Sequence, residues 1–328
     1  MSDDSEVIEW VADSDPALQW QVARDLLDAP EVEWASIRSR IESEGVGAAL
    51  LSLQGSDGQW SGGAFVPGGY DWSRMQEEGQ PWTATTWALT QLRELGWDPS
   101  SPRARETVRL VGENARWDHD GQPYWSGEVE ECINGRTVAD GAYFGVDVAP
   151  IVSRLVGESQ PDGGWNCERC NGSIRSSFAT TINVLEGLLE FEQATGGTAE
   201  SRAARRRGEE YLLHRRLFLR ASTGEPADAQ FLSLTYPTRW RYDVLRVLDY
   251  FRSAARADGM APDERLAEAI ELVRSKRDEA GRWRMDWKPR GPTLLDLDEG
   301  PGHASRWITL RALRVLRWWD DHNDRRAS

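Results

Sequence analysis

Apolar residues recur three and four positions apart through most of the chain, which is typical of amphipathic α-helices. The pattern predicts two sets of helices that alternate along the sequence. A charge-rich set covers residues 33–53, 102–113, 147–158, 199–218 and 263–276, and a more apolar set covers residues 82–95, 133–144, 174–194, 239–255 and 303–319. Another helix is predicted near 16–28, because Asp15-Pro16 suits a first helical turn.

Glycine-rich turns with tryptophan separate the two helices in four of the five pairs. The turns are Asp57-Gly58-Gln59-Trp60, Asp120-Gly121 with Trp125, Asp162-Gly163-Gly164-Trp165 and Gly281-Arg282-Trp283. Two following helices share a tripeptide, Ala84-Thr85-Thr86 and Ala179-Thr180-Thr181. A repeated pair cannot bury its apolar face alone. The predicted fold is therefore all-α, an α/α toroid in which five to six helix pairs close a ring with the apolar helices inside.

No linker divides the chain, so we predict a single toroid domain over residues 1–328, with an N-terminal arm at 1–14 and a frayed tail at 320–328. The longest loops are 61–81, 222–238 and 284–302. Loops of such length in a compact domain are often functional.

Composition narrows the function classes. The net charge of −15 repels phosphate backbones and anionic lipid, which argues against nucleic-acid binding. No apolar run reaches the length of a transmembrane helix, and the acidic N-terminus is not a secretory signal. Three cysteines fit a reduced, cytoplasmic setting. The 17 tryptophans, against seven tyrosines and seven phenylalanines, reflect the repeated turns.

The Asp-Gly-x-Trp turn before an apolar helix resembles the QW repeat of squalene-hopene cyclases and the GGW/GGF repeat of protein prenyltransferase β subunits. The resemblance covers residues 45–320 and extends to cyclase-like bacterial proteins of unsettled function, through Gly127-Glu128-Val129-Glu130, Trp165-Asn166-Cys167-Glu168 and Ser305-Arg306-Trp307. It implies the toroid fold and an enzyme that binds an isoprenoid or other apolar small molecule in a central cavity.

Class II cyclases use a D-x-D-D motif whose middle aspartate is the acid. The nearest match here is Asp296-Leu297-Asp298-Glu299, so the resemblance makes Asp298 the acid, with Asp296 and Glu299 beside it to raise its pKa. A solvated acidic loop is the alternative. Asp140 and Asp243 are further candidates, because both fall within predicted apolar helices, four residues after Arg136 and Arg239 with which they are expected to pair.

The junctions between turns and apolar helices are expected to meet at one rim of the ring. Arg136, Arg175, Arg239, Arg241 and Arg306 fall there, together with Glu128. Arginines beside helix N-termini suit an anionic ligand, although mutual ion pairs would also explain them. Trp82, Trp240 and Trp307 are expected to line the ligand cavity, or to pack between helices.

Prenyltransferases bind zinc through a D-x-C pair and a later histidine. This chain has no D-x-C, but His303 stands in a similar place and Cys167-x-x-Cys170 has a spacing that suits zinc. With Cys132 these residues would form a Cys₃His site, whereas buried structural cysteines are the alternative.

Three functions stay open at this point. They are a cyclase-like or prenyltransferase-like enzyme with acid-initiated or metal-assisted chemistry, a non-catalytic toroid that binds a ligand or protein at its rim, and a zinc-dependent transferase that requires a partner subunit. A carbohydrate-active toroid is a further alternative, which paired carboxylates would mark.

Overall fold

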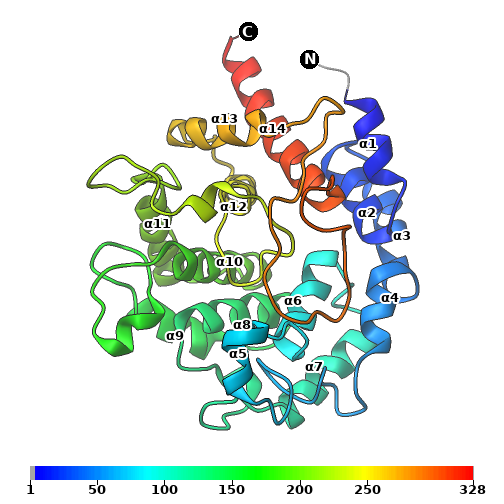
Figure 1. Ribbon diagram of the computed structural model, residues 1–328, viewed down its shortest axis with the longest axis vertical. Helices are drawn as coiled ribbons and strands as arrows, with labels where there is room; N and C mark the ends of the chain where they lie inside the picture. Colours follow the sequence, from blue (N-terminus) through cyan, green and yellow to red (C-terminus); the bar gives the residue numbers. More distant parts are fainter. Residues whose placement is uncertain (1–3, 328) are drawn as a thin grey trace. The chain divides into compact units, whose positions relative to one another are not determined.

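The computed structural model describes residues 4–327, and in that range every regular element is a helix (Figure 1). The predicted all-α class is therefore confirmed. Extended segments in the described range meet only as isolated bridges, such as that between Arg284 and Ala304. No helix among the described residues is both long enough and apolar enough to cross a membrane.

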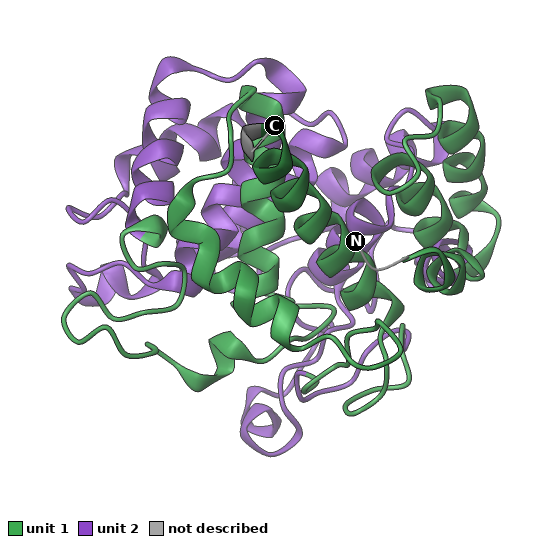
Figure 2. Cartoon of the chain, turned by 90° about the horizontal axis from the view of Figure 1, so that it is seen from above, with its two compact units in different colours: residues 1–45, 212–288, 297–328 green, residues 46–211, 289–296 purple. Residues whose placement is uncertain are grey.

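The chain divides into two compact units that interleave along the sequence (Figure 2). Unit 1 comprises Met1–Gly45, Leu212–Lys288 and Leu297–Ser328, and unit 2 comprises Val46–Tyr211 and Pro289–Asp296. Closure of the helix pairs into a ring stays a prediction.

Unit 2 is built around the close contact of two buried helices, α8 and α10, which lie side by side in Figure 1. Its helices are α4 (Gly45–Ser52, from Val46 onward), η2 (Trp72–Arg74), α5 (Met75–Glu78), α6 (Thr85–Leu95), α7 (Pro102–Asn114), η3 (Tyr124–Ser126), α8 (Glu131–Tyr143), α9 (Ala149–Gly157), η4 (Cys167–Asn171), α10 (Phe178–Thr195) and α11 (Ala199–Leu213, up to Tyr211). A Cβ on Gly135 would lie 2.5 Å from the Asn183 carbonyl oxygen, and one on Gly187 would lie 2.3 Å from that of Gly135. Glycine at both positions lets the two backbones approach.

Unit 1 packs α12 against α14, and α2 against α1, α3 and α14. Its helices are α1 (Ser5–Ala12), α2 (Pro16–Asp25), α3 (Glu31–Ser39), η1 (Arg40–Glu42), η5 (Ala229–Leu232), α12 (Val244–Asp258), η6 (Glu264–Leu266), α13 (Ala267–Ser275) and α14 (Arg306–Ala327). As in unit 2, the apolar helices are the buried ones. The charge-rich helices bury less of their surface. In unit 2, for example, α7 buries only Ala104, Thr107 and Val111.

Three of the predicted tryptophan turns share one set of hydrogen bonds. The indole N–H of Trp60, Trp165 and Trp283 donates to a carbonyl ten residues earlier, at 2.8, 2.7 and 2.7 Å. Their backbone N–H groups donate to threonine hydroxyls of the following helix, Thr85, Thr181 and Thr309, at 3.2, 3.1 and 3.0 Å. The glycine two residues before each tryptophan (Gly58, Gly163 and Gly281) has a positive φ and touches a neighbouring segment where a Cβ would not fit.

The fourth turn and the shared tripeptide differ from the prediction. The Trp125 indole donates to Val108, 17 residues earlier, rather than ten. The threonines that bind the tryptophan turns are the second residue of Ala84-Thr85-Thr86 but the third of Ala179-Thr180-Thr181. The two tripeptides are therefore not equivalent by position.

Several predicted helix boundaries are wrong. The segment 33–53 is interrupted before Gly45, whose φ is +64°, so it forms α3, η1 and α4. The segment 239–255 becomes helical only at Val244, because Arg239 has a φ of +56° and Asp243 caps the helix. The predicted N-terminal arm contains α1, and the tail predicted to fray is helical to Ala327.

Candidate functional site

The N-terminal end of α14 holds the Asp298 carboxyl in unit 1. The Ser305 hydroxyl donates to Asp298 Oδ2 at 2.5 Å, while the Ser305 oxygen accepts the Ile308 N–H at 3.0 Å and so caps the helix. Burial raises the pKa of Asp298 from 3.8 to about 6, against the opposing effect of hydrogen bonds from Ser305 and the Arg306 backbone. Asp298 is therefore a half-buried carboxyl, held by Ser305, whose pKa is raised to about 6.

The other two carboxyls of the acidic run have different surroundings. Asp296 is exposed, belongs to unit 2 and accepts the Thr293 hydroxyl at 3.2 Å. Glu299 is exposed, and its repulsion is the smallest of the causes that act on the pKa of Asp298. Burial thus contributes most to the raised pKa of Asp298, and the expected repulsion from Glu299 adds to it.

The helix that Ser305 caps carries Trp307, which stacks on a tyrosine from the loop before α12. Trp307 stacks on Tyr236 with ring centroids 4.9 Å apart, and the Arg311 guanidinium lies 4.7 Å from the Tyr236 centroid. Trp307 and Tyr236 are buried. The sequence analysis singled out Trp307 but missed Tyr236 and Arg311. Arg311 could have been found from its spacing, since it follows Trp307 by one helical turn.

Asp243 is a helix cap rather than a residue inside a helix, which corrects its predicted position. Its carboxyl accepts the Arg246 N–H at 2.8 Å. Burial raises the pKa of Asp243 to about 6, partly offset by the Arg246 and Thr235 N–H groups and by Arg311. Since α12 begins after Asp243, helical i, i+4 spacing does not relate it to Arg239.

Two more predicted site residues lie in the same unit. The Arg306 guanidinium lies 4.7 Å from the Trp10 ring centroid, and its Nε donates to the Trp10 carbonyl at 3.1 Å. The guanidinium carbon of Arg241 lies over the Trp240 ring, 4.6 Å from the ring centroid.

In unit 2 the charge of Arg136 acts on Asp140 as the expected pairing requires, and it opposes the rise in the pKa of Asp140 that burial causes. Both side chains also have hydrogen-bond partners that were not expected. Asp140 is fully buried and accepts Arg93 Nε at 2.8 Å and the Thr90 hydroxyl at 2.7 Å. The Arg136 guanidinium donates to the Asn183 side chain at 2.7 Å and lies 5.6 Å from the Trp87 centroid. Asp140 thus belongs to a buried ion pair whose cation, Arg93, the sequence analysis did not identify.

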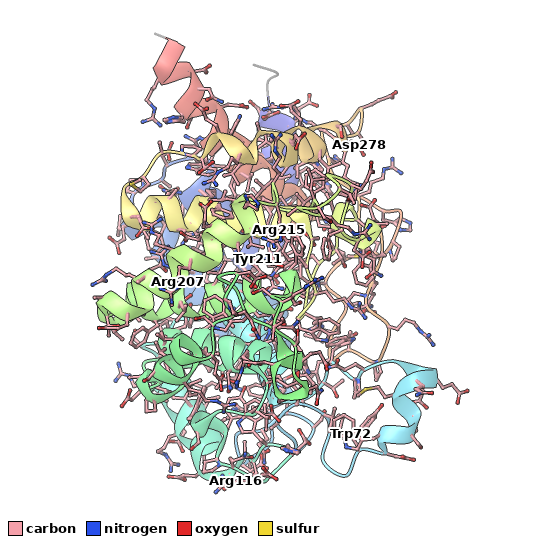
Figure 3. The ribbon with its side chains drawn as sticks, turned by 90° about the vertical axis from the view of Figure 1, so that its left-hand side faces the viewer. Trp72, Arg116, Arg207, Tyr211, Arg215 and Asp278 are labelled. Carbon is pink, nitrogen blue, oxygen red and sulfur yellow. The ribbon has the colours of Figure 1, made fainter. Side chains whose placement is uncertain are left out.

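The remaining predicted ligand residues of unit 2 make separate contacts and do not form one group. Trp82 packs edge-on against Trp87 with centroids 4.7 Å apart and donates its indole N–H to the Arg290 carbonyl at 2.8 Å. The buried Glu128 carboxylate accepts the Glu130 N–H at 2.7 Å, and Arg175 is exposed. Trp72 of the 61–81 loop, labelled in Figure 3, is 53% exposed.

Two cysteines and a glutamate of unit 2 form what we call the thiol cluster, Glu130, Cys132 and Cys167. Their ligand atoms all lie within 4.8 Å of one another. The Cys132 N–H donates to Cys167 Sγ at 3.4 Å, and a hydrogen bond with Cys167, together with burial, raises the pKa of the Cys132 thiol. Two thiols and a carboxylate are suitable donors for zinc, which prefers sulfur and oxygen ligands in a tetrahedral set.

The thiol cluster differs from the predicted Cys₃His set. Cys170 is exposed, donates to the Cys167 carbonyl at 3.6 Å and does not join the cluster, whereas Glu130 does. His303 is an exposed residue of unit 1.

Comparison with known proteins adds little to this geometry. No protein-family model matches the chain, and no curated protein matches it. One solved structure, of a protein from Actinoplanes, matches over 97% of this chain and 100% of the other, with 15% identity and a TM-score of 0.46. Similarity at this level carries no statement about what the chain binds or catalyses.

Proposed function

We propose that the chain is an enzyme of the terpenoid cyclase or prenyltransferase-like kind, which acts on an isoprenoid or other apolar small molecule with Asp298 as its general acid. The observation that carries the proposal is the Asp298 carboxyl, held by Ser305 at the start of α14 with its pKa raised to about 6. A general acid works best when its pKa lies near the working pH.

The surroundings of Asp298 favour chemistry that generates positive charge. The proton would pass from the carboxyl to an alkene carbon or epoxide oxygen of the substrate, leaving a carbocation. The cation would then lose a proton to water, or add water and release a proton, and solvent would return a proton to the carboxylate. Aromatic faces stabilise cations. Trp307, two residues after Ser305, and Tyr236, which stacks on it from the loop before α12, are the aromatic rings that this proposal assigns to that role.

The test compares two aspartates of the same acidic run. Purified protein is incubated with squalene or with farnesyl diphosphate, and products are identified by gas chromatography and mass spectrometry. Asp298→Asn should lower turnover by about 10²–10⁴-fold, the usual contribution of a general acid. The control Asp296→Asn removes an exposed carboxyl and should leave turnover within about twofold.

The pH profile sharpens this test. Turnover should fall as pH rises above about 6, because the protonated form of Asp298 is lost. Turnover that survives Asp298→Asn, with folding verified by circular dichroism, would remove Asp298 from the mechanism. If wild-type protein converts neither probe, a non-catalytic toroid that binds a ligand or protein at the Arg/Glu-rich rim becomes the better hypothesis.

The thiol cluster favours a second candidate, a zinc-dependent transferase that works with a partner subunit. Glu130, Cys132 and Cys167 would hold the ion. Zinc so bound would supply Lewis acidity or an activated thiolate.

A further inference from the structure

The turn before α12 presents a guanidinium that has no carboxylate partner among the described residues. Arg241 is half-buried, and its guanidinium carbon lies 4.6 Å from the Trp240 ring centroid and 5.2 Å from that of Trp287. Its Nε is buried and has no hydrogen-bond acceptor. Burial lowers the pKa of Arg241, and no negative group acts against that effect. A buried donor without an acceptor costs free energy, so the buried Nε favours a group that supplies one.

A second donor without an acceptor lies on the same contact. The indole Nε1 of Trp287, whose ring packs on Arg241, is also buried and unpaired. By contrast, the buried indoles of Trp60, Trp165 and Trp283 each donate to a carbonyl at 2.7–2.8 Å. Two neighbouring donors that both lack an acceptor indicate that the acceptor is supplied from outside the chain.

Hydrogen bonds hold the backbone at both residues, and with it the positions from which their side chains extend. The Arg241 N–H donates to the Thr238 carbonyl at 3.0 Å, and its own carbonyl accepts Arg246 Nη1 at 2.5 Å. The Trp287 carbonyl accepts the Thr235 hydroxyl at 2.7 Å. A site whose donors are fixed before the ligand arrives loses little entropy when it binds.

We propose that Arg241 and Trp287 bind the carboxylate group of a small molecule, with the ring faces of Trp240 and Trp287 against its apolar part. The side edge of a guanidinium, with its Nε, matches a carboxylate in a bidentate pair. One guanidinium and one indole N–H balance a single negative charge. A diphosphate carries more charge than this one unpaired cation can compensate. The site goes beyond the proposed function and requires no chemistry at Asp298.

Octanoate is a suitable probe, with 1-octanol as its uncharged counterpart and inorganic pyrophosphate as the competing anion class. Isothermal titration of the full chain should show octanoate binding, with 1-octanol and pyrophosphate at least tenfold weaker. Arg241→Gln should weaken octanoate binding at least about tenfold, as expected for loss of a charge-assisted hydrogen bond. Arg284→Gln is the matched control, because Arg284 is exposed and already pairs with Asp278 at 3.4 Å, so it should bind as wild type does.

Trp287→Phe separates the indole donor from the ring. Phenylalanine keeps an aromatic face and removes Nε1, so octanoate should bind about three- to tenfold more weakly. The exposed Trp72→Phe is its control and should change nothing. This pair also keeps the test decisive if Arg241→Gln fails to fold.

Two results would overturn the site. Octanoate binding that is absent in wild type, or unchanged in both Arg241→Gln and Trp287→Phe, would mean that solvent satisfies these donors. Pyrophosphate binding tighter than octanoate would overturn the carboxylate assignment. Neither result depends on turnover, so failure here is distinguishable from failure of the Asp298 proposal.

Discussion

Two groups of charged side chains in unit 1 differ in how their charges are balanced. In what we call the core network, Arg314 donates to Asp249 at 2.7 Å, to Gln21 at 2.9 Å and to Asp25 at 3.2 Å. Near the starts of α12 and α14, by contrast, Arg241 has no carboxylate partner among the described residues and Asp298 has no ion pair at hydrogen-bond distance.

The pKa values express the same difference. Arginines of the core network lower the pKa of Asp25 to about 2, although burial alone would raise it. Burial prevails at Asp298 and raises its pKa to about 6. Buried charges that have a full set of counter-charges are explained by structure, whereas those without an ion pair identify candidate sites.

The largest expected effect is on the core network. Arg314→Met would leave Asp25 and Asp249 buried with part of their positive charge removed. Breaking a buried pair from one side costs about 3–5 kcal/mol in the free energy of unfolding. Urea denaturation measures it, and Arg274→Met, which breaks an exposed pair with Asp320, should cost about 0–1 kcal/mol. Equal losses in both variants would contradict the distinction drawn here.

A smaller effect of opposite sign is expected at Asp298. A carboxyl whose folded pKa is raised contributes stability below pH 3.8 and loses it as pH rises through about 6. Asp298→Asn should therefore increase the free energy of unfolding at pH 7, by about 1–3 kcal/mol, and have little effect below pH 4.

Asp25→Asn should have the opposite effect on stability, because the pKa of Asp25 is lowered rather than raised in the folded protein. The pKa of Asp25 is lowered to about 2, so its contribution is present above pH 3.8 and is lost as pH falls through about 2. The variant should be less stable than wild type at pH 7, and the gap should narrow in acid. Thermal melts from pH 3 to pH 7 test both variants, and parallel curves would be the contrary result.

The smallest expected effect is a change in metal content at the thiol cluster of unit 2. Its thiols and carboxylate either bind one another through hydrogen bonds or bind a zinc ion. We expect about one zinc per chain by elemental analysis of protein purified without chelator. Cys132→Ser and Cys167→Ser should lose it, while Cys170→Ser should keep it. Metal-free wild-type protein would assign these thiols a structural role.

The repeat was the most predictable part of the fold. Gly58, Gly163 and Gly281 mark turns whose backbone requires a positive φ, which glycine adopts readily. The tryptophan two residues later is large enough to hydrogen-bond to the preceding helix. The break before Gly45 and the late start of α12 were missed. In both places a residue with positive φ, Gly45 or Arg239, interrupts the helix, although the apolar pattern continues through it in the sequence.

The candidate site was predicted only in part. Asp298, Trp240 and Trp307 came from motif and resemblance, and Ser305 stood in a quoted motif without a role. Tyr236 contacts Trp307, and Trp287 contacts Arg241, from segments distant in sequence, so no local spacing pointed to them.

The sequence by itself determined the helical class, the tryptophan turns and the residue types available for chemistry, because periodicity, glycine and tryptophan act over one or two helical turns. Only the tertiary structure decided which charges are balanced. Arg314 and Arg241 are both arginines near apolar residues in sequence, yet one meets Asp25 and Asp249 and the other meets two indole rings. Charge balance depends on contacts between segments that are up to hundreds of residues apart, and the local sequence pattern does not predict such contacts.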